Sequence, residues 1–326
     1  MSKTMRAAVC VRAGGPEVLE LREIPVPGER AGWSLVRVRG AGLNRSELRT
    51  RQGHSPAVVF PRVLGIECVG TVVASGELAP GTTVAAVMGE LGRAFDGGYA
   101  EYALIPDALL MPVTTTLPWE VLAALPETYL TAQGALDALG ALDAVGIEPG
   151  GRLLIRGGTS SVGLAAASIA AGHGLEVTAT TRRPDKADGL RAAGVDHVLI
   201  DDPALDDGVP LPCTPDYVLD LVGARTTVDS LRLVRRGGTV CVAGSLSGWT
   251  IAGFEPIAAI PSGTKLTAFH SDDLKGATAV LQRIVDAVET GTYRPNLDRV
   301  FALDDIVAAH RYMEDDEATG KIIVVP

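Results

Sequence analysis

One stretch of the sequence decides the fold: Arg152-Leu-Leu-Ile-Arg-Gly-Gly-Thr-Ser-Ser-Val-Gly163. A short apolar strand runs into a loop of small residues, and the loop opens an alanine-rich helix from Leu164 to Ala171. A second strand, Glu176 to Thr181, follows the helix. Strand, loop, helix and strand in this order predict a βαβ unit that binds a nucleotide pyrophosphate.

Small residues in this loop leave room for phosphate oxygens. The first N–H groups of a helix lack backbone partners and the helix dipole adds partial positive charge, so an anion can dock where no side chain intervenes. Gly157 permits a tight turn, Ser160 allows close approach, and Gly163 lets the helix pack against the strand. The spacing Gly-x-x-Ser-x-x-Gly is a weak signal alone and gains specificity from the βαβ frame. The predicted loop contacts are Gly157, Gly158, Ser160, Ser161, Val162 and Gly163.

The residues after the second strand indicate which dinucleotide binds. An NAD site places Asp or Glu about 20 residues past the glycines, whereas Arg there accommodates a 2′-phosphate. This chain has Thr181-Arg182-Arg183, with Lys186 one helical turn on. Arg and Lys bind phosphate, and a helix start does not otherwise favour three cations, so the cluster predicts NADPH over NADH. The alternative is that the three cations form an ordinary solvated helix start.

Composition limits the class of protein. The 326 residues are enough for two domains, and 47% hydrophobic content with 38 glycines suits an α/β enzyme. A formal charge of −10 argues against nucleic acid as a partner. Four cysteines form no Cys-x-x-Cys pair, which fits buried free thiols in a reducing compartment. Because no leader-like segment and no run of 18 apolar residues occurs, we expect a cytoplasmic protein with no membrane partner.

The order of elements along the chain predicts two domains. Residues 1–125 show short strands separated by Gly and Pro, whereas residues 126–270 alternate strands with helices, which predicts a doubly wound parallel sheet. The tail Gly320 to Pro326 reads as a last strand that pairs with the first domain. We therefore expect a β-rich domain from residues 1–125 and 271–326, and a dinucleotide domain from residues 126–270.

Other elements follow from periodicity. Helices are expected over Asn44 to Gln52, from Trp119 to about Ala144, and from Leu274 to Glu289 with an apolar face. Strand ends of a doubly wound sheet face the ligand, so the turns after two later strands are candidate cofactor walls. Plain turns are the alternative interpretation. The wall candidates are Val222, Gly244, Ser245 and Leu246.

Taken together, these segments resemble the medium-chain dehydrogenase/reductase superfamily, in its zinc-free branch of quinone oxidoreductase (zeta-crystallin-like) proteins. The resemblance implies a GroES-like β-rich catalytic domain, a Rossmann NADPH-binding domain, and a homodimer formed through the strand near Lys265 to Phe269. The matching segments cover nearly the whole chain: Gly42-Leu-Asn44, Arg51-Gln-Gly53, Leu64-Gly-Ile-Glu67 with Gly70, Gly97-Gly-Tyr-Ala-Glu-Tyr102, Leu130-Thr-Ala132, Gly157 to Gly163, Lys186, Ala193-Gly194 and Gly320-Lys-Ile322.

The metal ligands of the zinc members are missing. Zinc alcohol dehydrogenases of the superfamily carry Cys where this chain has Asn44, and His where it has Ile66, directly before Glu67. The cysteine run of their structural zinc site is absent too, and the five histidines are dispersed. We therefore expect no catalytic metal.

The resemblance also implies a substrate site. Asn44 and Thr131 are expected near the nicotinamide, with Asn44 orienting and hydrogen-bonding, although a helix-cap role for Asn44 is equally open. Many members have Tyr where this chain has Ser55, so His54 or solvent must supply any proton. Tyr129 is an alternative phenol, but a tyrosine within a helix is more often core.

Chemistry without a Lewis acid favours particular substrates. An alcohol or simple ketone lacks metal stabilisation of its alkoxide, whereas a quinone or α,β-unsaturated carbonyl spreads the hydride's charge over an oxygen that hydrogen bonds can stabilise. The leading hypothesis is an NADPH-dependent reductase of quinones or small activated alkenes. An enoyl-thioester reductase and a low-turnover NADPH-binding sensor or structural protein are the alternatives, and turnover separates the last from the others.

Overall fold

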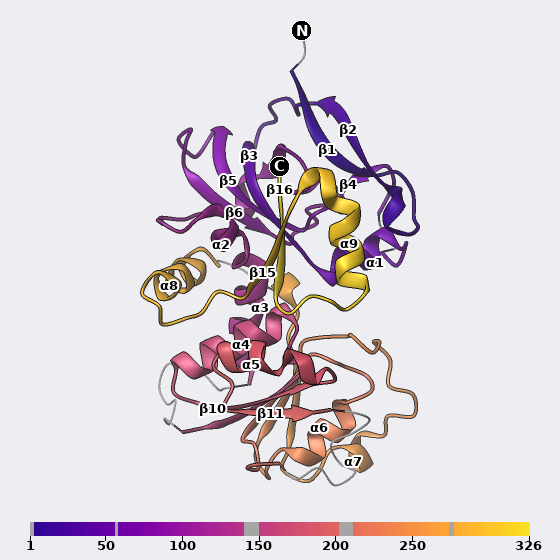
Figure 1. Ribbon diagram of the computed structural model, residues 1–326, viewed down its shortest axis with the longest axis vertical. Helices are drawn as coiled ribbons and strands as arrows, with labels where there is room; N and C mark the ends of the chain where they lie inside the picture. The colour runs from indigo at the N-terminus through magenta and orange to yellow at the C-terminus, as the bar shows by residue number, and fades with distance from the viewer. Residues whose placement is uncertain (1–2, 56–57, 140–149, 202–210, 274–276) are drawn as a thin grey trace. The chain divides into compact units, whose positions relative to one another are not determined.

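The computed structural model describes residues 3–55, 58–139, 150–201, 211–273 and 277–326 (Figure 1). The chain forms two compact units. Unit 1 comprises Met1–Glu127, Gly276–Thr290 and Leu297–Pro326, and unit 2 comprises Thr128–Lys275 and Gly291–Asn296. Among the described residues, no helix has the length and apolar character needed to cross a membrane.

Unit 1 is built mainly on antiparallel strands. A three-stranded sheet has the order β2-β1-β4, with β1 at Thr4–Cys10, β2 at Leu19–Pro25 and β4 at Arg62–Val63. A larger sheet has the order β15-β16-β3-β5-β6-β8, with β7 also paired to β3. Its strands are β3 (Trp33–Leu43), β5 (Glu67–Ala74), β6 (Thr83–Val87), β7 (Tyr102–Pro106), β8 (Leu110–Pro112), β15 (Leu297–Ala302) and β16 (Lys321–Val325).

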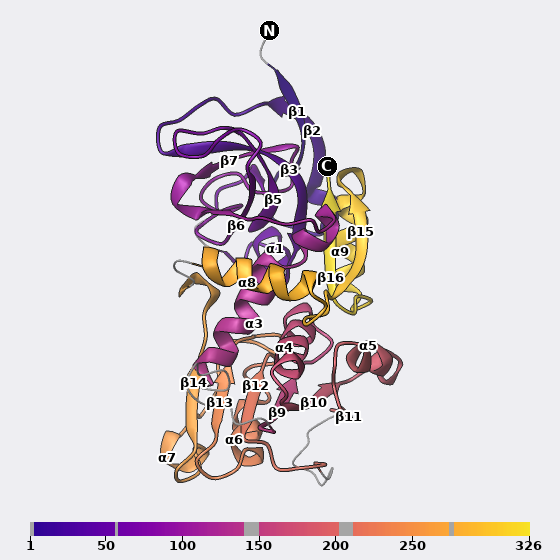
Figure 2. The same cartoon turned by 90° about the vertical axis from the view of Figure 1, so that its left-hand side faces the viewer.

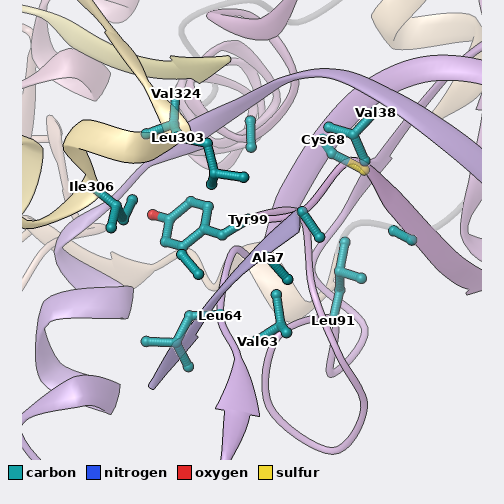
Figure 3. Packing of buried hydrophobic residues seen from close by; sticks show 14 of the residues in the cluster. Ala7, Val38, Val63, Leu64, Cys68, Leu91, Tyr99, Leu303, Ile306 and Val324 are labelled. Atoms are coloured by element: carbon teal, nitrogen blue, oxygen red, sulfur yellow. The ribbon is translucent and has the colours of Figure 1, made fainter. Parts of the chain in front are cut away.

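The core of unit 1 lies between these strands and the helices that cover them. Figure 3 shows the Tyr99 ring packed among Leu64, Leu303, Ile306 and Val324, which come from separate parts of the chain. The helix α8 presents the predicted apolar face, because Leu281, Ile284, Val285 and Val288 are buried. The helices assigned to unit 1 are α1 (Arg45–Arg51), α2 (Trp119–Ala123), α8 (Thr278–Glu289) and α9 (Ile306–Glu314), and α3 (Pro126–Ala138) begins there and continues into unit 2.

The tail strand pairs as the sequence predicted. β16 lies antiparallel to β3, with Ile322 opposite Leu43, and parallel to β15 on its other side. Its residues Ile322, Ile323 and Val324 are buried. The chain therefore returns to the first sheet after building the second unit.

Unit 2 is a doubly wound sheet of six parallel strands in the order β11-β10-β9-β12-β13-β14, which Figure 2 shows side by side. This order confirms the Rossmann prediction, since the strand order reverses between β9 and β12. The strands are β9 (Arg152–Arg156), β10 (Glu176–Thr181), β11 (His197–Ile200), β12 (Tyr217–Asp220), β13 (Thr239–Val242) and β14 (Lys265–Ala268), and the helices after them are α4 (Ser161–Gly172), α5 (Ala187–Ala192), α6 (Thr227–Leu233) and α7 (Pro256–Ala259).

Two details differ from the sequence-based expectation, and one part of it is not tested. The helix expected from Trp119 is two helices, α2 and α3, because Pro126 fits the first turn of a helix and cannot continue one. Strands β8 and β15 were not predicted. The expected helical residues 140–144 and 274–276 lie outside the described residues.

Candidate functional site

The loop between β9 and α4 has the geometry of a phosphate-binding turn. Gly157 has a φ of 79°, a left-handed conformation that favours glycine. A Cβ on Gly158 would lie 2.9 Å from the Ala179 Cβ of β10. A Cβ on Gly163 would lie 2.6 Å from the carbonyl oxygen of Gly158. The close partner of Gly163 is therefore the loop itself, and not the strand that we expected.

Ser160 holds the loop and the helix together. It is the N-cap of α4, and its hydroxyl accepts a hydrogen bond from the Gly163 N–H (3.1 Å) and donates one to the Gly157 carbonyl (2.8 Å). Ser160 is therefore a helix cap, while close approach to phosphate stays its predicted role. The side chains of Ser161 and Val162 are half-buried at the first turn of α4. Their backbone N–H groups belong to the helix start that favours anions.

The basic cluster stands at the carboxyl end of β10. Thr181 is buried, and its hydroxyl accepts a hydrogen bond from the Arg183 N–H (3.0 Å). Arg182 is exposed, whereas Lys186 is buried in the turn before α5. The Arg183 guanidinium pairs with Asp185 (2.7 Å) and lowers the pKa of that carboxyl. Because the pair is exposed, its free energy is small and a phosphate can compete for Arg183.

Loops after three strands meet beside Gly157. A Cβ built on Gly157 would lie 3.3 Å from the Val222 side chain and 3.6 Å from that of Leu246. Gly244 has no room for a side chain, since its Cβ would lie 2.1 Å from the Leu221 carbonyl oxygen. Ser245 is half-buried between Gly244 and Leu246. These wall candidates therefore gather at the switch point of the sheet, where the phosphate loop also lies.

Sequence reasoning missed a buried ion cluster next to this loop. Arg156, the last residue of β9, is fully buried, and its guanidinium contacts Asp201 (2.9 Å) and Asp229. Burial opposes the charge of Arg156, but the two carboxylates outweigh it and raise the pKa of the guanidinium. The signal available in the sequence was an arginine at the end of an otherwise apolar strand.

Asn44 lies in unit 1 as the N-cap of α1. It forms a capping box with Glu47, and its Nδ2 donates to Glu67 Oε1 (3.0 Å) and to Glu47 Oε1 (3.4 Å). Its Oδ1 accepts a hydrogen bond from Lys321 Nζ. Both amide hydrogens of Asn44 are therefore engaged within unit 1. These contacts fit the helix-cap interpretation, while the role at the nicotinamide stays a prediction.

Two carboxylates and one ammonium form a buried charged cluster around Asn44. Lys321 pairs with Glu67 Oε1, and Glu67 Oε2 accepts the Glu127 N–H (2.9 Å) in the first turn of α3. Glu47 accepts the Ile66 N–H (3.0 Å). Burial raises the pKa of Glu47 to about 7. Lys321 thus supplies a cation to Glu67 from 254 positions away in the chain.

This donor set does not suit zinc. The positions that match zinc ligands hold a carboxamide at Asn44 and an alkyl side chain at Ile66, and Glu67 is already paired with Lys321. Tetrahedral zinc needs thiolate, imidazole or carboxylate ligands at several of these positions. Within the part of the chain that the structure describes, no group of three or more His, Cys, Asp or Glu could hold a metal ion.

The remaining candidates lie on or next to two different helices. His54 is exposed and follows α1, at the opposite end of that helix from Asn44. A helix of seven residues separates them by roughly 10 Å, so His54 does not join the Asn44 cluster. Thr131 is buried one turn after Glu127 on α3. Tyr129 is also buried and donates to the Arg294 carbonyl, which confirms its expected place in the core.

Family models match two parts of the chain. Residues 30–115 match the alcohol dehydrogenase GroES-like domain, which confirms the expected class of the β-rich half. Residues 193–324 match a model described as zinc-binding dehydrogenase.

Relatives and solved structures match almost the whole chain. The quinone oxidoreductase of Homo sapiens is 28% identical over 341 aligned residues, covering 99% of this chain and 98% of that protein. The crystal structure of an NAD-dependent alcohol dehydrogenase is 30% identical, with a TM-score of 0.84, covering 99% of this chain and 100% of that one. Mycobacterial Rv1454c, solved in complex with NADPH, is 25% identical, with a TM-score of 0.83 and the same coverage. One of these proteins is described as NAD-dependent and the other was solved with NADPH. The choice between NADH and NADPH for this chain must therefore be argued from its own residues.

Proposed function

The chain belongs to the medium-chain dehydrogenase/reductase superfamily, in its quinone oxidoreductase branch, and we propose that it is a metal-independent NADPH reductase of quinones or small α,β-unsaturated carbonyls. At the coarser level it is an oxidoreductase that uses a nicotinamide cofactor and a small-molecule substrate. In this proposal residues 126–270 form the NADPH-binding domain, and residues 1–125 with 271–326 form the catalytic domain.

One observation carries the choice of NADPH: the exposed Arg182 at the end of β10, where an NAD site would hold a carboxylate. Arg183 and Lys186 add two cations within the next turn. The acidic side chain in this turn, Asp185, is occupied by Arg183. A 2′-phosphate would therefore meet guanidinium donors at this strand end.

The absence of zinc ligands at Asn44 and Ile66 supports a substrate that needs no Lewis acid. NADPH, when bound, supplies the hydride. The loop from Gly157 to Gly163 would hold the pyrophosphate, and Val222 and Leu246 would line the cofactor beside it. Asn44, Thr131 and His54 stay the proposed catalytic residues, and His54 or solvent would supply any proton.

The contacts of Asn44 favour a second candidate, a low-turnover NADPH-binding sensor. Both amide hydrogens of Asn44 are used by Glu47 and Glu67, and Ser55 stands where many members have a tyrosine. A chain that binds the pyrophosphate but whose Asn44 amide is already engaged would bind NADPH and reduce little. Turnover separates the two candidates.

The test is a fluorescence titration of NADPH and NADH with the wild type and Arg182→Ala. We expect the variant to raise the Kd for NADPH by about tenfold and to leave that for NADH unchanged, because NADH lacks the 2′-phosphate. Arg191→Ala is the matched control, since Arg191 is an exposed arginine on α5 that pairs with Asp188. NADH preference in the wild type would overturn the assignment of the cofactor.

Turnover is measured next, as NADPH oxidation with a panel of small quinones and enones. Reduction of any member supports the reductase, and tight NADPH binding with no reduction supports the sensor.

The proposal includes two further expectations from the family resemblance. A homodimer would form through β14, which is the last strand of its sheet, and sedimentation of the purified protein tests this. A cytoplasmic location stays a prediction.

A further inference from the structure

The Arg156 side chain joins three elements next to the phosphate loop. Arg156 ends β9 and directly precedes Gly157. Its Nη2 lies 2.9 and 3.0 Å from the two oxygens of Asp201, and its Nε lies 3.2 Å from one of them. Its Nη1 contacts Asp229 in the first turn of α6. All three side chains are at least nine-tenths buried.

Asp201 stands beside the expected 2′-phosphate position. Strands β10 and β11 pair with Thr181 opposite Ile200, and the Asp201 N–H donates to the Thr181 carbonyl (3.0 Å). Neighbouring strands lie about 5 Å apart, so Asp201 and Arg182 leave adjacent strand ends at the same edge of the sheet. A carboxylate at this edge is the kind of group that favours a ribose hydroxyl and disfavours a phosphate.

The charge of the Asp201 carboxylate affects whether a phosphate can bind at this edge of the sheet. A free carboxylate within a few ångströms of a 2′-phosphate would repel it strongly in a partly buried site. In the structure Arg156 binds both oxygens of that carboxylate, which compensates its charge and fixes its direction. Within the part of the chain that the structure describes, the hydrogen bonds of this cluster join two carboxylates to one guanidinium, that of Arg156.

We propose that Arg156 is a specificity-determining residue, which holds the Asp201 carboxylate in a buried ion pair and so allows the edge of the sheet to accept a 2′-phosphate. Arg156 acts through Asp201 and is a positioning residue. The inference rests on the proposed function, because it concerns the choice of NADPH over NADH. A purely structural arginine would affect both cofactors alike, since they differ only in the 2′-phosphate.

The test measures the ratio of Kd for NADPH to Kd for NADH by fluorescence titration of the full chain. Arg156→Met should raise this ratio about tenfold, because Asp201 loses its counter-ion. The double variant Arg156→Met with Asp201→Asn should return the ratio to within about twofold of the wild type. Arg152→Met is the matched control: Arg152 begins the same strand and pairs with Asp216 (3.0 Å) at the opposite edge of the sheet, so the ratio should not change.

A second variant covers the case in which Arg156→Met does not fold. Arg156→Lys keeps a buried cation but loses the two-pronged contact, so we expect a rise of about threefold that Asp201→Asn again removes. Equal changes in both Kd values, or a rise that persists after Asp201→Asn, would overturn the inference. A wild type that prefers NADH would instead overturn the proposed function, before any Arg156 variant is compared.

Discussion

At the scale of single residues, burial sets the charge of Glu47. The carboxyl lies in unit 1 beside Glu67 and Lys321, and its pKa rises from 4.5 to about 7 because of burial. Between these two pH values the folded protein keeps a proton that the unfolded chain has lost. Protonated Glu47 therefore contributes fully to the free energy of unfolding below about pH 4.5, and this contribution is lost as the pH rises through 7.

Glu47→Gln should remove this pH dependence, because glutamine does not titrate. We expect the free energy of unfolding of the wild type minus that of the variant to fall by roughly 1 to 3 kcal/mol from pH 4.5 to 7. Urea unfolding at several pH values measures it, with exposed Glu77→Gln as the control. A difference that stays constant or grows with pH would contradict the assignment.

Gly163 gives a second prediction at this scale. A methyl group there would lie 2.6 Å from the Gly158 carbonyl oxygen, so Gly163→Ala must displace the phosphate loop. We expect NADPH affinity to fall by at least about tenfold, together with a loss of roughly 1 to 3 kcal/mol in stability. Gly28→Ala, whose Cβ would meet nothing within 4 Å, should leave both unchanged.

Local motifs made some of these residues predictable and not others. The tight turn before α4 and the position of the cations after β10 could be predicted because each lies within one short segment. The partners of Asn44 and Arg156 could not, because Lys321 is 277 positions from Asn44 and Asp229 is 73 positions from Arg156. Only the folded sheets bring such pairs together.

At the scale of elements, the start of α4 depends on one hydroxyl. Ser160→Ala removes the acceptor for the Gly163 N–H, which should cost about 1 kcal/mol of stability. The conservative variant Ser160→Thr keeps a hydroxyl and should lose only a few tenths of a kcal/mol. Thermal unfolding with and without NADPH measures both variants. Equal losses in the two variants would show that the cap does not matter.

The pattern of elements was predictable where burial was regular. The strands of unit 2 form apolar runs because helices cover both faces of the sheet, so β9 to β13 stood out in the sequence. Strand β15, Leu297–Ala302, did not, because four of its six residues are polar or exposed. It pairs with β16 along one edge and forms a strand through this pairing.

At the scale of the whole molecule, unit 1 depends on the strand that follows all of unit 2. A chain that stops before Lys321 loses β16, which pairs with β3 on one side and β15 on the other. It also loses the cation that pairs with Glu67. We expect unit 1 to become sensitive to protease, whereas NADPH still protects unit 2.

Limited proteolysis followed by mass spectrometry of the fragments measures this difference. A chain that stops after Val325 keeps all of β16 and is the control. Protection of unit 1 without β16 would show that this strand is dispensable.

The pairing of β16 with β3 also sets the order of events on the ribosome. The paired residues Leu43 and Ile322 are about 280 positions apart, so tens of seconds pass between their synthesis. During this time one edge of β3 lacks its final neighbour, and open strand edges invite aggregation or binding by chaperones. The six parallel strands of unit 2 are complete before β16 is made. Unit 2 can therefore fold on the nascent chain before β16 pairs with β3 and completes the large sheet of unit 1.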